Sequence, residues 1–286
     1  MKLDIIISPL DLDLTLGCGQ TFRWRKADDG LWEGPLGNQF IRLGQKGSTV
    51  HVNASPGGRD IEGKVRTYLR AEDDVKRIQK VLSRDLVIAR GIHKLKGLRI
   101  VKIDEWECLI SFMLATYANI PRISKMIETL SSRYGEEIVA GVNAFPDQQS
   151  LREVPMSELS KCGFGYRARF IHEVCKILDD NALSKLRRMS YEDLRESLKE
   201  LPGVGDKVAD CVALFGFGRL EAFPIDVWIE RALGRLYEQR GPYNRLRMFA
   251  HERFGPYAGY AQEYLYFNER LRAADGRCAF SEERDD

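Results

Sequence analysis

The stretch that decides the fold lies at residues 201–211 and reads Leu-Pro-Gly-Val-Gly-Asp-Lys-Val-Ala-Asp-Cys. A helix that approaches it must stop at Pro202, because proline lacks the amide hydrogen that a helix needs. Gly203 and Gly205 follow, and glycine can take the positive φ of a sharp reversal. The stretch therefore predicts two helices joined by a tight glycine turn.

Helical signals stand on both sides of this turn. Upstream, Ser190 is suited to cap a helix, and leucines recur at helical spacing behind it. The second helix is expected to open at Asp206, and Lys207 and Cys211 stand four residues apart on it. Residues at that spacing are neighbours on a helix surface. We therefore predict a helical hairpin over about residues 190–217, with the lysine and the cysteine pointing into the same space.

The start of the second helix has the chemistry of an anion site. A helix that begins just after two glycines presents unpaired main-chain amides and the positive end of its dipole, with no side chains to block close approach. The GxxxxGK[ST] spacing of nucleotide-binding loops is absent, which favours a duplex backbone over a free nucleotide. The alternative is an ordinary helical corner with a surface lysine. Downstream, Asp226 is suited to cap the next helix.

Length and composition bound the class of protein. The 286 residues predict two compact units, and a formal net charge of +2 means that any affinity for DNA must come from local arrangement. The six cysteines include no CxxC pair, so zinc ribbons and four-cysteine iron-sulfur loops are unsupported and we expect no bound metal. The short apolar run near the N-terminus lacks the length of a signal peptide or a membrane span, so we expect a soluble intracellular protein.

The chain changes character along its length. Up to about residue 55, short apolar runs alternate with glycine turns, as in an antiparallel meander with strands at 22–24, 31–32, 40–43 and 49–52. Helical periodicity follows. We therefore predict an α+β fold with an N-terminal domain of antiparallel sheet and helices at residues 1–97, and a mainly α-helical region at residues 98–286 that contains the hairpin.

These patterns resemble a known family. The Leu-Pro-Gly-Val-Gly turn, the lysine that follows and the downstream Pro-Ile-Asp look like the helix-hairpin-helix and Gly/Pro-Asp motif of a DNA glycosylase superfamily. Within it, residues 207–211 resemble most closely the 8-oxoguanine DNA glycosylase/AP lyases. The resemblance implies that Lys207 attacks C1′ of the damaged nucleotide and that Asp226 stabilises positive charge developing on the sugar. It implies no cofactor.

The same resemblance implies a pocket for the flipped base. The sequence Gly-Gln-Thr-Phe-Arg-Trp, which begins at Gly19, is similar to the family's N-terminal signature, whose glycine carbonyl accepts a hydrogen bond from N7–H of 8-oxoguanine. Guanine carries a lone pair at N7, so the carbonyl would attract one base and repel the other. The last helix resembles the family's in placing Gln262 at the Watson–Crick edge. The base would lie between Cys211 and Tyr266, with Phe267 as the alternative stacking ring.

Further positions match the family's contacts to the rest of the duplex. Asn119 and Arg122 match an asparagine-rich loop that enters the duplex and an arginine that contacts the base left without its partner. Tyr117 replaces the asparagine that fills the gap. Tyr166 and Arg167 are expected to project from a glycine corner, as a wedge at the lesion and a reader of the orphaned cytosine.

Phosphate contacts are expected at Gly203 and Gly205 and at Trp228, which replaces a phosphate-contacting histidine of the family. The resemblance as a whole implies a bifunctional enzyme that excises 8-oxoguanine through a lysine Schiff base and cleaves the strand by β-elimination. The expected partner is double-stranded DNA with oxidised guanine opposite cytosine, bound by a monomer that stays with the cell's DNA and away from membranes. Two alternatives remain open: an alkylated-base DNA glycosylase, and a non-catalytic helix-hairpin-helix DNA-binding protein.

Overall fold

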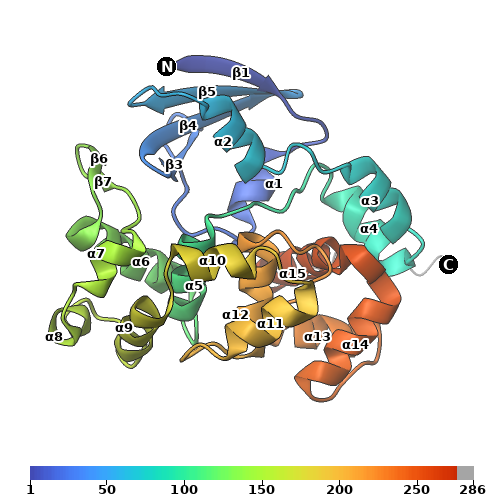
Figure 1. Ribbon diagram of the computed structural model, residues 1–286. Coiled ribbons are helices and arrows are strands. Elements are labelled where there is room, and N and C mark those ends of the chain that lie inside the picture. The colour runs from blue at the N-terminus through green and yellow to red at the C-terminus, as the bar shows by residue number, and fades with distance from the viewer. Residues whose placement is uncertain (276–286) are drawn as a thin grey trace.

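The computed structural model describes residues 1–275 and has an antiparallel five-stranded sheet near the N-terminus (Figure 1). The strands stand in the order β1-β5-β4-β3-β2, and every neighbouring pair is antiparallel. Their bounds are β1 Lys2–Ile6, β2 Arg25–Lys26, β3 Trp32–Leu36, β4 Gln39–Lys46 and β5 Thr49–Ser55. The α+β class predicted from the sequence is confirmed.

Alternating side chains give the sheet one apolar face. Ile41 and Leu43 are buried on β4, and Val50 and Val52 are buried on β5, because successive residues of a strand point to opposite sides. Leu43 pairs with Val52 across the two strands, so the buried positions are in register. Helix α2 (Ile61–Tyr68) contacts β1 and lies on the side of the sheet that faces the helical region (Figure 1).

The structure differs from the predicted meander in two places. Residues 22–24 do not form a strand, because β2 begins only at Arg25. Trp24 instead packs into the core, with its ring centroid 5.5 Å from that of Tyr68. The N-terminal residues form β1, which pairs with β5 from Lys2 opposite Asn53 onward. This pairing joins segments about fifty residues apart, which local sequence patterns do not reveal.

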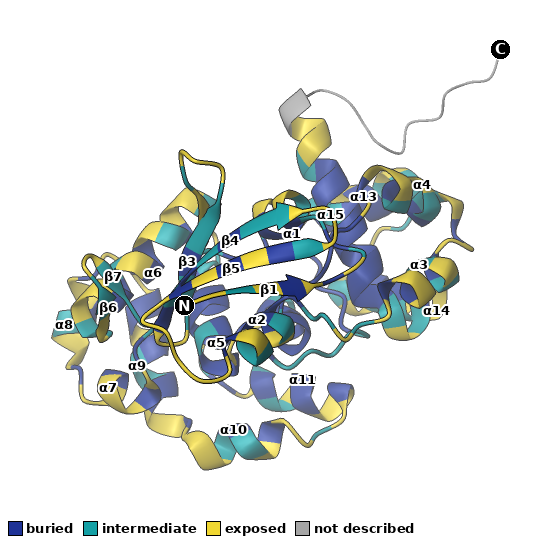
Figure 2. Cartoon of the chain, turned by 90° about the horizontal axis from the view of Figure 1, so that it is seen from above, coloured by how far each residue is buried: buried dark blue, intermediate teal, exposed yellow. Residues whose placement is uncertain are grey.

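The rest of the described chain is helical. Helix α5 (Glu105–Leu114) is almost wholly buried, and Figure 2 marks buried residues along the chain in dark blue. The last helix, α15 (Ala258–Asp275), packs against α13 and α4. The other elements are α1 Leu12–Gly17, α3 Val75–Leu82, α4 Leu86–Lys94, α6 Ile120–Tyr134, β6 Glu137–Val139, β7 Val142–Asn143, α7 Gln148–Arg152, α8 Met156–Ser160, α9 Arg167–Ile177, α10 Asp180–Leu186, α11 Tyr191–Lys199, α12 Asp206–Cys211, η1 Val212–Gly216, α13 Val227–Leu236, α14 Tyr243–Phe254 and η2 Gly255–Tyr257.

Part of the predicted N-terminal domain, residues 1–97, packs against the helical region. Helices α3 and α4 lie near α15 in Figure 1, and α4 contacts that helix directly. The division between residues 97 and 98 therefore stays a prediction. Within residues 1–275, every helix is too short or too polar to cross a lipid bilayer.

Candidate active site

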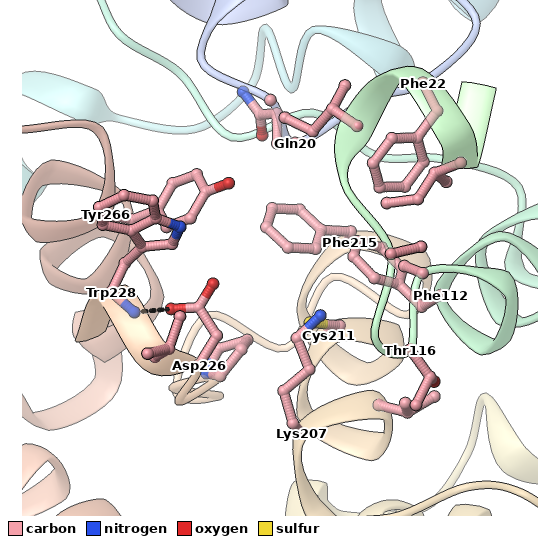
Figure 3. Close-up of a pocket in the computed structure, with 18 of the residues that line it drawn as sticks. Gln20, Phe22, Phe112, Thr116, Lys207, Cys211, Phe215, Asp226, Trp228 and Tyr266 are labelled. Carbon is pink, nitrogen blue, oxygen red and sulfur yellow. Dashed lines mark hydrogen bonds between the residues drawn. The ribbon is translucent and has the colours of Figure 1, made fainter. Parts of the chain in front are cut away.

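A cavity of about 790 Å³ lies between the hairpin, the start of α13 and the last helix, and this volume is in the range of pockets that bind small molecules. Figure 3 shows Lys207 and Cys211 on one wall and Asp226, Trp228 and Tyr266 across from them. The residues predicted for catalysis and base binding all line this cavity: Gly19, Lys207, Cys211, Asp226, Gln262 and Tyr266. In the described part of the chain, His, Cys, Asp and Glu form no group of three that could hold a metal ion.

The hairpin has the predicted form. Ser190 caps α11, since its Oγ accepts the N–H of Asp193 at 3.2 Å, and α12 begins at Asp206 as expected. Gly203 has a φ of +80°, and a Cβ atom there would stand 2.6 Å from the Phe170 ring. The turn therefore requires glycine at position 203.

Gly205 differs from the prediction of a positive φ. Its φ is −97°, because it is the N-cap residue of α12, a position that takes extended backbone. A Cβ atom at Gly205 would meet no other atom within 4 Å. No side chain caps the first amides of α12, so the main-chain N–H groups at this end remain open to an anion. The predicted phosphate contacts of both glycines stay predictions.

Lys207 and Cys211 share one wall of the cavity, one turn apart on α12. The Lys207 Nζ lies 5.2 Å from the centroid of the Phe112 ring. Burial raises the pKa of the Cys211 thiol to about 12, although the nearby Lys207 acts to lower it. The thiol is therefore neutral at pH 7, and the role of Lys207 as the nucleophile stays a prediction.

Asp226 caps α13 as predicted. Its Oδ1 accepts the main-chain N–H groups of Trp228 at 2.9 Å and Ile229 at 3.0 Å. These two bonds fix the direction of the carboxylate, which Figure 3 shows facing the open space between Tyr266 and Lys207. Capping thus directs the carboxylate into the cavity, and its predicted role toward a sugar stays a prediction.

Gly19 lines the end of the cavity that is predicted to bind the base. Its φ is +105°, and a Cβ atom there would overlap the Arg270 guanidinium, so glycine is required. The Gln262 side chain is buried, and its Oε1 has no hydrogen-bond partner among residues 1–275. An unpaired buried acceptor is costly unless a ligand satisfies it. Tyr266 lines the cavity, whereas Phe267 is buried outside it, which selects Tyr266 as the ring that can stack.

Glu263 and Arg270 also line the cavity, and neither was predicted as a site residue from the sequence. Glu263 is buried, and its Oε1 has no hydrogen-bond partner in the part of the chain that the structure describes. Burial raises the pKa of Glu263 to about 7, opposed by Cys18 and Arg270 and reinforced by Asp226. The Arg270 guanidinium donates to the Cys18 carbonyl and lies 5.7 Å from the Tyr266 ring centroid. The only sequence signal is that both charges interrupt the aromatic-rich last helix.

Comparisons with known proteins place this site in a family. Residues 2–109 match the 8-oxoguanine DNA glycosylase N-terminal domain, and residues 110–253 match the HhH-GPD superfamily base excision DNA repair protein. The N-glycosylase/DNA lyase OGG1 of Arabidopsis thaliana is 31% identical over 91% of this chain and 77% of its own. The chain belongs to the 8-oxoguanine DNA glycosylase family.

Solved structures agree with this membership. The glycosylase resembles MBOgg1, solved with a low affinity DNA ligand, with a TM-score of 0.89 and 31% identity over 95% of this chain and 96% of that one. It also resembles the Clostridium acetobutylicum 8-oxoguanine glycosylase/lyase, solved with double-stranded DNA containing cytosine opposite 8-oxoG. That match has a TM-score of 0.86 and 28% identity over 92% of this chain and 93% of that one. The family resemblance inferred from the motifs is therefore confirmed.

The rim of the glycosylase cavity carries Tyr117 and Asn119. Tyr117 is 93% exposed and has a φ of +50°, a region that bulky side chains rarely adopt and that is often found at functional sites. Asn119 caps α6 by accepting the N–H of Arg122 at 3.0 Å, and the Arg122 side chain is exposed. Asn119 therefore acts as a helix cap in the free protein, and entry of this loop into a duplex stays a prediction.

The second corner corrects one expectation. Tyr166 is 53% exposed and projects as predicted, but Arg167 is only 4% exposed. Its guanidinium donates to the main-chain oxygens of Thr116 at 3.0 Å and Phe164 at 3.2 Å. Carbonyl groups near the end of α5 lack helical partners and attract a cation. Arg167 therefore does not project in the free glycosylase, and its contact with an orphaned cytosine stays a prediction.

Trp228 forms part of the cavity wall next to the cap. Its indole lies beneath the Arg231 guanidinium, 5.3 Å from the ring centroid. Its main-chain amide is already bonded to Asp226. Any contact between this residue and a phosphate therefore has to come from the indole, and it stays a prediction.

Proposed function

We propose that this glycosylase excises 8-oxoguanine from duplex DNA through attack by the Lys207 amine and then cleaves the strand at the same site. One observation carries the proposal: Lys207 and Asp226 face the same cavity as Gly19 and Gln262. The name N-glycosylase/DNA lyase in the Arabidopsis relative supports both activities. The structure of a relative on DNA with cytosine opposite 8-oxoG supports that duplex as the substrate.

The chemistry follows from an amine and a carboxylate in one cavity. The lone pair of Lys207 Nζ forms a bond to C1′ while the bond from C1′ to the base breaks, and the bonding electrons leave with the base. Asp226 stabilises the positive charge on the sugar. Opening of the sugar ring then gives an imine between Lys207 and C1′. The imine acidifies the C2′ proton, whose loss breaks the C3′–O bond and expels the 3′ phosphate. Water finally hydrolyses the imine and frees the lysine.

Selection of the damaged base would rest on acceptors in the cavity. The Gly19 carbonyl would accept N7–H of 8-oxoguanine, and Gln262 would bond the Watson–Crick edge while Tyr266 stacks on the ring. An opposed lone pair costs about 1–3 kcal/mol, or roughly ten- to a hundredfold in discrimination. Extrusion of the base costs a few kcal/mol of stacking and pairing, which wedging by Tyr117 and Tyr166 would offset.

The opposite strand would be read by arginine. Arg122 is exposed and can approach an unpaired cytosine directly. Arg167 would first have to release the Thr116 carbonyl that it binds in the free protein. We propose cytosine as the preferred opposite base on this ground, with the protein acting as a monomer in the compartment that holds the DNA.

Borohydride trapping tests the proposed function. The substrate is a duplex with one 8-oxoguanine opposite cytosine, compared with an undamaged duplex, and the proteins are wild type and Lys207→Gln. We expect a covalent adduct only with wild type and only on damaged DNA. Base release without an adduct would indicate a hydrolytic glycosylase and a wrong role for Lys207. The absence of both base release and a covalent adduct would overturn the substrate assignment.

A further inference from the structure

A buried carboxyl group lies behind the helix that carries the nucleophile. Asp210 stands three residues after Lys207 on α12 and is 0% exposed. It does not line the cavity. Its Oδ1 accepts the phenol of Tyr191 at 2.6 Å and pairs with Arg195 Nε at 3.2 Å, and its Oδ2 accepts the phenol of Tyr243 at 2.6 Å. A carboxylate that is out of reach of the substrate and yet fully bonded has a structural task.

The phenol of Tyr243 has a second partner. Its oxygen accepts the main-chain N–H of Ile225 at 3.2 Å, while its O–H donates to Asp210. A hydroxyl can do both at once, because it has one donor and two acceptor lone pairs. Ile225 is buried and immediately precedes Asp226, the cap of α13. One phenol therefore joins the helix of the lysine to the segment that ends in the catalytic carboxylate.

The segments that link Tyr243 to the two catalytic residues are conformationally restricted. Asp210 belongs to the same short helix as Lys207, so its position fixes that of the lysine backbone. On the other side, Pro224 restricts the backbone ahead of Ile225. Asp226 is in turn held by its two cap bonds. The open cavity lies between Lys207 and Asp226. Their separation therefore has to be maintained by contacts on the side of α12 that faces away from the cavity.

We propose that Tyr243 is a positioning residue that sets the separation of Lys207 and Asp226 by clamping Asp210 to the main chain of Ile225. The inference rests on the proposed function, because it concerns the geometry of that reaction. Loss of the clamp leaves the cavity and its DNA-facing surface intact but lets the two catalytic groups drift apart. Misplacement by about 1 Å can slow a positioned reaction by about a hundredfold.

Tyr191 supplies a matched control. Its phenol donates to the same carboxyl group, at the same distance of 2.6 Å, but through the other oxygen. It comes from α11, and its ring stacks on His251, so it has no bond to the segment before Asp226. Tyr191→Phe and Tyr243→Phe thus remove the same kind of hydrogen bond from Asp210. Only Tyr243→Phe also frees the Ile225 N–H.

The experiment compares the full-length wild type with these two variants. Binding is measured on a duplex that holds a tetrahydrofuran abasic analogue, which cannot form an imine. Chemistry is measured as the single-turnover rate of 8-oxoguanine excision and of borohydride trapping at saturating enzyme, at a temperature well below each Tm. We expect Tyr243→Phe to lower both rates about 10- to 100-fold with Kd within about twofold. Tyr191→Phe should keep the rates within about threefold of wild type.

A purely structural role for Tyr243 predicts a different pattern. Both variants would then lose similar stability and keep similar single-turnover rates, and this result would overturn the proposal. Site-specific replacement Tyr243→p-aminophenylalanine adds a rescue, because its amino group can donate to Asp210 and accept from Ile225. Rates above those of Tyr243→Phe are expected, and equal rates would count against the clamp.

Two contingencies are covered by the same assays. Should Tyr243→Phe fail to fold, Tyr243→p-fluorophenylalanine, whose fluorine fills the space of the hydroxyl but donates no hydrogen bond to Asp210, is compared with wild type and Tyr191→Phe. A slowed reaction at unchanged Kd then supports the clamp, and an unchanged rate refutes it. Failure of the wild type to form an adduct on the 8-oxoguanine duplex would instead remove the proposed function, so the two failures are distinguishable.

Discussion

The pH dependence of stability tests the buried carboxyl group of Glu263. Burial raises its pKa from the ordinary value of 4.5 to about 7 in the folded protein, and unfolding returns it to the ordinary value. A carboxyl group with a raised pKa binds its proton more tightly when folded, so its ionisation destabilises the fold as pH rises through this interval. The cost is about 1 kcal/mol at pH 5 and about 3 kcal/mol at pH 8, at 1.36 kcal/mol per pKa unit.

The substitution Glu263→Gln removes this titration while keeping the shape of the side chain. The groups that bear on Glu263, which are Cys18, Arg270, Asp226 and Tyr266, remain in place. We expect the free energy of unfolding of the variant, relative to wild type, to rise by about 2 kcal/mol between pH 5 and pH 8. Urea denaturation followed by circular dichroism measures both proteins at each pH. Contributions from all other titrating groups that behave alike in the two proteins cancel in the difference.

The control is built into the pH range. Below about pH 3.5 Glu263 is almost fully protonated in both the folded and the unfolded protein, and above about pH 8 it is almost fully ionised in both. The difference between the two proteins should therefore change little outside this interval. A difference that stays constant from pH 5 to pH 8 would refute the reasoning, because it would mean that Glu263 titrates alike in the folded and unfolded protein.

Three further predictions concern the hairpin, the cap and the second corner. Asp226→Asn should keep the cap, because asparagine is also a good N-cap residue, yet lower single-turnover excision by about 100-fold or more. Gly203→Ala should lower stability in thermal unfolding by about 1–2 kcal/mol from its positive φ alone, and strain against Phe170 adds to this. Gly205→Ala should leave Tm nearly unchanged. Equal losses of stability in the two variants would contradict the turn geometry. Arg167→Ala should reduce stability in urea denaturation by roughly 2–3 kcal/mol, because it removes charge-assisted bonds to main-chain oxygens. A variant with unchanged stability and reduced DNA affinity would contradict the buried position of the Arg167 side chain.

The local features of the hairpin could be predicted from sequence because each rests on neighbouring residues. The caps at Ser190 and Asp226 are hydrogen bonds within three residues, and the start of α12 at Asp206 follows directly on the glycine turn. The residue types that can make such bonds are few. For the same reason, the positive φ of Gly203 is confirmed, whereas at Gly205 the N-cap geometry of the following helix decided the backbone instead.

The features that escaped prediction depend on distant partners. Strand β1 is fixed by pairing with β5, and neither strand signals the other. The inward turn of Arg167 depends on the carbonyl of Thr116, some fifty residues earlier. Glu263 enters the cavity because α15 packs with that face toward Cys18, and no periodicity in an aromatic-rich helix reveals which face that is.

The character of the cavity also argues for the kind of base it takes. Gln262 and Glu263 each bury a side-chain oxygen without a hydrogen-bond partner, and each such acceptor costs about 1–3 kcal/mol in the free protein. A ligand that brings donors to both oxygens recovers that cost, whereas a ligand that brings lone pairs adds to it. Oxidised guanine carries donors at N1, at the exocyclic amine and at N7, one ring position more than guanine itself. Guanine shares the donors at N1 and at the amine, so we expect the Gln262 and Glu263 oxygens to favour both guanine bases over other bases. The proposed contact of the Gly19 carbonyl with N7–H would then separate the damaged base from guanine. Recognition and chemistry would fall to different walls of the same cavity.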